Sequence, residues 1–179
     1  MKRSTPERLA ALGKWASDLE SEAEYSVAAG QPRPQTSLVV CTARYTTKDP
    51  DRLDVTRLGA IRYQKKHGKV APGEFLAPSN DLLWPHKRAR AEVDRLLASN
   101  LITLEEAQQR FDALWSSYQE RFRGEMRRSY LDRRAEWNAL LARPRVTLVC
   151  FCRWEQCHRY LLAGFLVKLG AAAGGELEA

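Results

Sequence analysis

The chain has no long hydrophobic run, and no export signal is expected. Its longest apolar run, residues 161–167, has seven residues, whereas a helix that crosses a bilayer needs about 20. No apolar stretch follows the N-terminal Met-Lys-Arg, so no secretory signal peptide is predicted. The four cysteines are therefore expected to be reduced thiols rather than a disulfide framework. We expect a cytoplasmic protein without a membrane partner.

Repeats and low-complexity segments are also missing, and the composition is that of a folded domain. Hydrophobic residues make up 44% and charged residues 28% of the 179 residues, which excludes disordered and fibrous classes. The 29 Lys and Arg residues outnumber the 22 Asp and Glu residues, giving a net charge of +7. This excess suits an anionic partner, but it is well below the charge density of a dedicated nucleic-acid tail.

Short apolar runs predict the strands of an α/β domain with a small, mostly parallel sheet. They lie at residues 37–41, 53–57 and 146–152, and the last is apolar on both faces, as a central parallel strand is. Residues 59–77 are expected to be irregular and basic. Because helical patterns separate the strands, the sheet is expected to be flanked by helices.

Helical patterns are longest between the second and third predicted strands. Thr103 and Glu106 have capping-box spacing, and the amphipathic pattern that they open predicts a long helix before the last strand, with a bend at Gly124. An earlier helix, beginning near residue 78, is expected to divide at Pro85. A further helix is predicted over residues 157–169.

These elements predict three parts of the chain. Residues 1–30 form an N-terminal helical extension, residues 31–170 a single α/β domain, and residues 171–179 a flexible tail.

The densest group of reactive side chains lies where the last predicted strand joins the helix after it. Ligands of open α/β sheets bind beyond the carboxyl ends of the strands, where helix N-termini carry partial positive charge. Cys157, His158 and Arg159 lie at such a helix start. Cys157 is a candidate nucleophile or anion anchor, His158 a candidate acid/base, and Arg159 a candidate anion clamp.

Polar side chains near the ends of the other predicted strands are expected to reach the same edge. A carboxylate, a hydroxyl and guanidiniums there suit a ribose, a phosphate or a carboxylate. Asp54 is a candidate base and Arg57 a candidate clamp, although Asp54 could equally form a surface ion pair. Ser79 could close the site or cap a helix. The full set of expected ligand-binding residues is Arg159, Arg57, Thr56, Arg44, Tyr45 and Ser79.

Two other readings of the chemistry stay open. Cys152, Cys157 and His158, with Cys41 as a fourth ligand, contain the donor atoms of a structural zinc site, whereas Cys150 is expected to fill space in the core. Alternatively, the arginine-rich helical stretch at residues 121–134 could contact a nucleic-acid backbone.

The order of these motifs resembles the domain of unknown function 488 family. The resemblance rests on Asp-Val-Thr-Arg at residues 54–57, Phe-Leu-Ala-Pro-Ser at 75–79, the strand at 146–152 and Cys-His-Arg at 157–159. It implies a compact, Rossmann-like α/β domain of no established reaction, with Asp54, Thr56, Arg57, Pro78, Ser79 and the Cys-His-Arg triplet at its pocket. Some members have a glutamate where this chain has Cys152.

The favoured interpretation is an enzyme-like domain that binds an anionic small molecule, such as a nucleotide or nucleoside derivative. Its candidate catalytic residues are Cys157, His158 and Asp54, with no metal ligand among them. Whether the domain is an enzyme, which cofactor it uses and its oligomeric state are left open by the sequence.

Overall fold

The structure is a computed structural model, and it describes residues 36–152 and 156–177. Its contacts divide the chain into two compact units. We call the first the sheet unit (the described residues up to 55 and from 135) and the second the helical unit (residues 56–134). The predicted extension at residues 1–30 lies outside the described residues.

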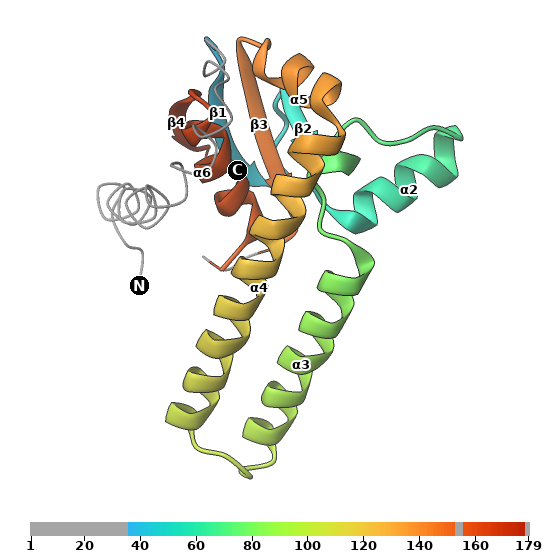
Figure 1. The fold of residues 1–179 in the computed structure, drawn as a ribbon. Helices are drawn as coiled ribbons and strands as arrows, with labels where there is room; N and C mark the ends of the chain where they lie inside the picture. The colour runs from blue at the N-terminus through green and yellow to red at the C-terminus, as the bar shows by residue number, and fades with distance from the viewer. Residues whose placement is uncertain (1–35, 153–155, 178–179) are drawn as a thin grey trace. The chain divides into compact units, whose positions relative to one another are not determined.

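The sheet unit contains a four-stranded sheet, which confirms the predicted α/β class (Figure 1). The strands are β1 (Val39–Arg44), β2 (Arg52–Asp54), β3 (Arg145–Cys150) and β4 (Ala172–Glu176), in the order β2-β3-β1-β4. Each of the three pairings is parallel. The carboxyl ends of the strands therefore meet at one edge.

Burial explains why β1 and β3 occupy the centre of the sheet. Val40 and Ala43 of β1, and Val146 and Leu148 of β3, are at most 2% exposed. A strand with neighbours on both sides and helices against its faces needs such an apolar run. Two helices complete the unit: α5 (Arg134–Leu141) and α6 (His158–Lys168), of which α6 contacts β1, β3 and β4.

The fourth strand differs from the expectation of a flexible tail. Residues 172–176 form β4, and the Ala172 amide donates to the Leu38 carbonyl over 2.8 Å. The register shifts between Val40 and Cys41 of β1, so Gly174 is an extra residue opposite them. Small residues hide this strand from pattern analysis because they supply almost no hydrophobic alternation.

The helical unit contains α2 (Arg57–His67), the 3-10 turn η1 (Glu74–Leu76), α3 (Asn80–Ala98) and α4 (Leu104–Asp132). The expectation of irregular structure at residues 59–77 is wrong, because Thr56 caps the start of α2 and Gly68 ends it in a left-handed conformation (φ 65°). Only Gly59 and Ala60 of α2 are buried. A helix with so little buried surface shows no amphipathic period in its sequence.

Helices α3 and α4 lie side by side as an antiparallel pair (Figure 1). Pro85 does not divide α3. Proline removes the hydrogen bond to the carbonyl four residues earlier, and Arg121 of α4 donates to that carbonyl, of Asp81, over 3.3 Å. The capping box of Thr103 is confirmed, whereas the expected bend at Gly124 is replaced by a break at Arg133. None of the helices in the described ranges is long and apolar enough to cross a membrane.

Candidate functional site

Three thiols and one imidazole gather at the carboxyl edge of the sheet unit. The Sγ atoms of Cys150, Cys152 and Cys157 and a ring nitrogen of His158 all lie within 4.8 Å of one another. Cys150 Sγ is 3.5 Å from Cys152 Sγ and 3.9 Å from His158 Nδ1. We call these four residues the Cys/His cluster.

The local backbone explains how the cluster forms. Cys150 is the last residue of β3, and Cys152 follows two positions later, just beyond the end of the strand, with its Sγ 3.5 Å from that of Cys150. The chain returns at Cys157, which is the N-cap of α6, and His158 is the first residue of that helix. One strand end and one helix start thus supply all four donors.

The orientation of His158 is set by a backbone carbonyl. Its Nε2 lies 2.9 Å from the carbonyl oxygen of Val55. Because a carbonyl only accepts hydrogen bonds, Nε2 carries the proton and Nδ1 presents its lone pair to the thiols. Burial lowers the pKa of His158, and this outweighs the opposing negative charges of Cys152 and Asp54. The imidazole is therefore neutral, which is the form that binds metals.

The three thiols divide into one acidic sulfur and two weakly acidic ones. Hydrogen bonds from Cys152 and Cys157 hold the pKa of Cys150 well below its ordinary value. The Cys150 sulfur in turn raises the pKa of Cys152, and burial raises that of Cys157 well above its usual range. Within the cluster, Cys150 is therefore the thiol whose pKa favours loss of the proton.

Arg159 supports the cluster from the next position along α6. Its side chain is 2% exposed, and its guanidinium donates to the Cys152 carbonyl over 3.0 Å, with Cys157 Sγ at 3.8 Å. It also forms an ion pair with Glu176 of β4 (2.9 Å) and donates to the Tyr160 hydroxyl over 2.6 Å. Burial raises the pKa of Tyr160 to about 12. A fixed positive charge thus lies beside the sulfurs.

The remaining predicted residues of the sheet unit lie near the strand ends. Arg44 ends β1 and is exposed. The next residue, Tyr45, stacks on Phe151 with ring centroids 3.7 Å apart, and the Arg52 guanidinium lies 4.9 Å from the Tyr45 ring. Asp54 ends β2, is partly buried, and acts on His158 through its charge.

The other three predicted residues belong to the helical unit, where each has a structural partner. Thr56 accepts from the Gly59 amide, and Ser79 accepts from the Leu82 amide at the start of α3 and donates to Glu125. Arg57 forms an ion pair with Glu74 (3.0 Å) and donates to the Pro78 carbonyl (2.7 Å). The side chains of Arg57 and Glu74 also line a hollow of about 270 Å³. Their roles in ligand binding stay predictions.

The structure changes which cysteines would belong to the structural zinc site considered from the sequence. Cys41, expected as the fourth ligand, lies in the middle of β1, where its Sγ faces Gly174 of β4. Cys150, expected only to fill space, takes its place in the cluster. The spacing of Cys150 and Cys152 in the predicted strand at residues 146–152 was the sequence signal for this pair. Glu176 gave no such signal, because it lies in the segment that was expected to be a flexible tail.

A comparison with models of protein families gives a match over most of the chain. The family model described as "DUF488-N3a: Active DUF488-N3 subclade" matches residues 40–170. No curated protein and no solved structure matches the chain significantly. The match covers most of the chain and includes β2, β3, nearly all of β1, the Cys/His cluster and the helical unit, whereas β4 lies beyond it. The chain therefore belongs to the DUF488 family, as its motifs predicted.

Proposed function

We propose that the chain is a zinc-binding α/β protein and that the Cys/His cluster holds the metal. The observation that carries this proposal is the convergence of four donor atoms within 4.8 Å. Zinc with three thiolates and one imidazole is a common structural type, with Zn–S bonds of about 2.3 Å. Tetrahedral ligands at that distance lie about 3.8 Å apart, close to the observed 3.5 and 3.9 Å.

The surroundings of the cluster support the same proposal. Metal-binding histidines usually donate their second ring N–H to a carbonyl or carboxylate, which fixes the tautomer, and the His158–Val55 hydrogen bond has this form. Three thiolates around Zn²⁺ leave one net negative charge. Arg159 supplies a buried positive charge beside two of the cysteines, and buried charges need such compensation.

All four proposed ligands come from the protein, which is typical of a structural rather than a catalytic zinc site. The metal would connect the end of β3 to the start of α6, and it would stabilise the folded state in proportion to its binding free energy.

The test is metal analysis of purified full-length protein with two matched variants. Cys152→Ala removes a proposed ligand, and Cys41→Ala removes a buried cysteine outside the cluster. We expect about one zinc per chain in the unsubstituted protein and in Cys41→Ala, and a large loss in Cys152→Ala. Cobalt substitution should give the visible absorption of tetrahedral cobalt thiolates. Folded, reduced protein without metal, or equal loss in both variants, would overturn the proposal.

A second candidate function is the predicted enzyme-like binding of an anionic small molecule at the same edge. It is favoured by the exposed Arg44 beside the stacked Tyr45–Phe151 pair, because guanidinium and aromatic groups suit phosphate and base. The two candidates differ in the role of Cys157, as metal ligand or as nucleophile.

The second candidate is tested by thermal shift with inorganic phosphate and adenosine monophosphate. Arg44→Ala should abolish any stabilisation that these probes produce, and Arg88→Ala, an exposed arginine of α3, should retain it. If neither probe raises the Tm of the unsubstituted protein at millimolar concentration, this candidate is wrong.

A further inference from the structure

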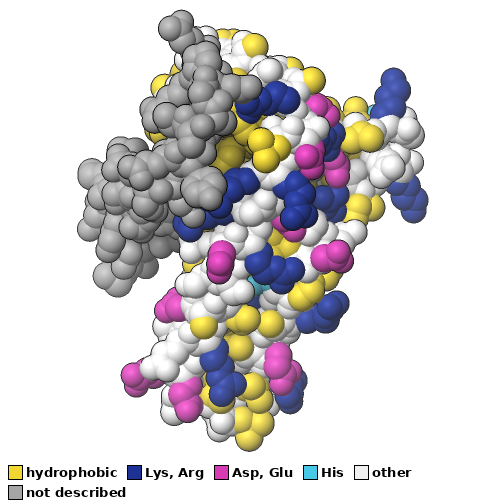
Figure 2. All heavy atoms as spheres, in the orientation of Figure 1, with side chains coloured by type: hydrophobic (Ala, Val, Ile, Leu, Met, Phe, Trp, Pro, Cys, Tyr) yellow, Lys and Arg dark blue, Asp and Glu magenta, His cyan; other side chains and the backbone are white. Residues whose placement is uncertain are grey.

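Helix α2 is an unusually exposed and unusually basic part of the helical unit. Every residue from Ile61 to Val70 is exposed. From Arg57 to Lys69 the sequence contains five Lys and Arg residues and no Asp or Glu. Figure 2 shows dark-blue side chains and no magenta ones at the outer end of α2. The charge of this segment is therefore of one sign.

Four of these cations are unused by the fold. Within the described residues, the side chains of Arg62, Lys65, Lys66 and Lys69 form no ion pair or hydrogen bond. Arg57, in contrast, is held by Glu74 and the Pro78 carbonyl. Four exposed like charges repel one another and stabilise the fold little, so a role outside the fold is the better explanation.

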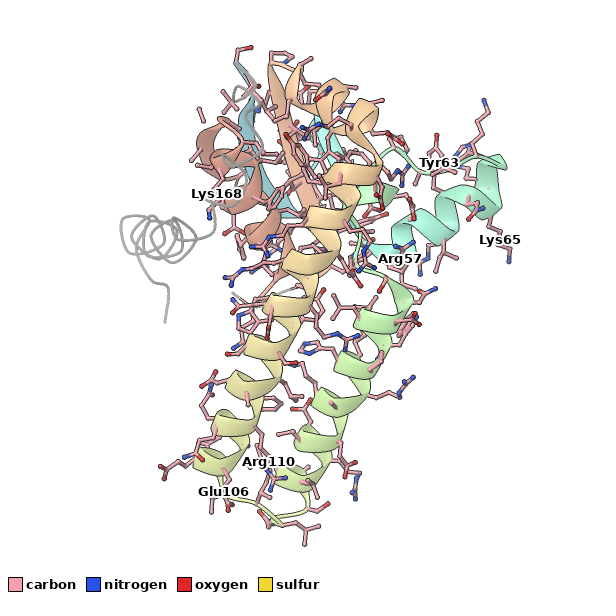
Figure 3. The ribbon with its side chains drawn as sticks, in the orientation of Figure 1. Arg57, Tyr63, Lys65, Glu106, Arg110 and Lys168 are labelled. Atoms are coloured by element: carbon pink, nitrogen blue, oxygen red, sulfur yellow. The ribbon has the colours of Figure 1, made fainter. Side chains whose placement is uncertain are left out.

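The spacing places the cations on one side of α2. Arg62 lies three positions before Lys65 and four positions before Lys66, so both lysines are its neighbours on one face of the helix. Lys69 follows just beyond the Gly68 cap. Tyr63 stacks on His67, with ring centroids 4.5 Å apart. Figure 3 shows Tyr63 and Lys65 on different sides of the helix. We call Arg62, Lys65, Lys66 and Lys69 the α2 basic stripe.

The arginines of residues 121–134, which were expected to offer a nucleic-acid contact, mostly have partners within the protein. Arg121 donates to the Asp81 carbonyl, Arg133 pairs with Glu74, and Arg134 lies 4.0 Å from the Tyr130 ring. Arg123 and Arg127 also have interaction partners. The unused positive charge of the helical unit is therefore more concentrated on α2 than on α4.

We propose that the α2 basic stripe binds the phosphate backbone of double-stranded nucleic acid. The stripe from residue 62 to residue 69 spans about 10 Å at 1.5 Å per residue, and duplex DNA carries one negative charge per about 1.7 Å of its axis. Several phosphates can thus lie against four cations. A membrane surface fits less well, because the exposed apolar residues Ile61 and Val70 form no continuous apolar face with Tyr63, which stacks on His67. This proposal is independent of the zinc site.

The test is fluorescence anisotropy with a short labelled DNA duplex over a range of KCl concentrations. Four phosphate contacts predict a slope of log K against log salt of about −3 to −4. The double variant K65A/K66A should weaken binding at least about tenfold at 0.1 M salt and reduce the slope by about 2. Circular dichroism should show an unchanged fold, because both positions are exposed and alanine favours helix.

The matched control removes two exposed arginines of α4 by R127A/R128A and leaves α2 intact. The proposal expects little change in affinity or slope for this variant. Equal weakening by the two double variants, no binding by the unsubstituted chain, or α2-dependent binding to anionic phospholipid vesicles without binding to DNA would each overturn it.

Discussion

Gly174 of β4 has no room for a side chain, and Gly174→Ala should destabilise the sheet unit. A Cβ at this position would lie 2.4 Å from Cys41 Sγ, 2.8 Å from Val39 Cγ1 and 3.2 Å from the Val40 carbonyl oxygen. The residue sits where the register between β1 and β4 shifts. Close approach of a neighbouring strand is a common reason for glycine at such a bulge.

The size of the effect follows from these distances. Carbon and sulfur atoms in ordinary contact are about 3.5–4 Å apart, so the new methyl group or Cys41 Sγ must move by more than 1 Å. Overpacking of a filled core costs about 1–3 kcal/mol. Because a second side chain and a backbone carbonyl also close around the position, we expect about 2–3 kcal/mol. For a chain of this size that lowers Tm by about 4–12 °C.

The assay is urea unfolding followed by circular dichroism, with two comparisons. Gly164→Ala, in α6, meets no atom within 4 Å, so it should be neutral or stabilising by up to about 1 kcal/mol through helix propensity. In a Cys41→Ala background the closest clashing atom is gone, so Gly174→Ala should cost less than it does alone.

Two results would refute this reasoning. One is a Gly174→Ala protein as stable as the unsubstituted chain. The other is the same cost with and without the Cys41 sulfur, which would show that the contact with Cys41 does not govern the effect.

Three further predictions concern single contacts. Burial raises the pKa of Glu74, but hydrogen bonds from Arg133 and Arg57 outweigh it and lower the pKa below 4.5; Glu74→Gln should cost about 1 kcal/mol at pH 7. That cost should shrink as pH falls through the lowered pKa. The measurement is urea unfolding at pH 7 and pH 3, and a stability difference between the two proteins that is larger at pH 3 than at pH 7 would contradict the prediction. Thr103→Ala should lose about 1 kcal/mol from the capping box, and Thr103→Ser should restore most of it; equal stability of both variants would show that the cap is unimportant. Trp137→Ala should cost about 3–5 kcal/mol, because Trp137 is fully buried, and a loss under 1 kcal/mol in thermal unfolding would contradict the packing.

Part of the candidate site could be predicted from the sequence because it is local. Cys157 and His158 are adjacent, and the strand before them and the helix after them are strongly patterned, so their place at the carboxyl edge followed from the α/β class. The capping box of α4 was equally readable, since its two residues are three positions apart. The family also followed from motifs in order along the chain.

The rest was decided by contacts between residues far apart in the chain. β4 forms because its backbone pairs with β1, about 130 residues earlier. Its small side chains give no strand pattern in the sequence. His158 is oriented by the Val55 carbonyl, 103 residues away, and Cys150 rather than Cys41 joins the cluster because strand register decides which sulfur faces the helix start.

The sequence by itself determined the fold class, the family and the neighbourhood of the Cys-His-Arg triplet, because these depend on patterns within a few residues. Only the tertiary structure decided which four donors meet, which arginines remain unused and where a glycine cannot be replaced. Those properties depend on distances between separate elements, and such distances are set by packing.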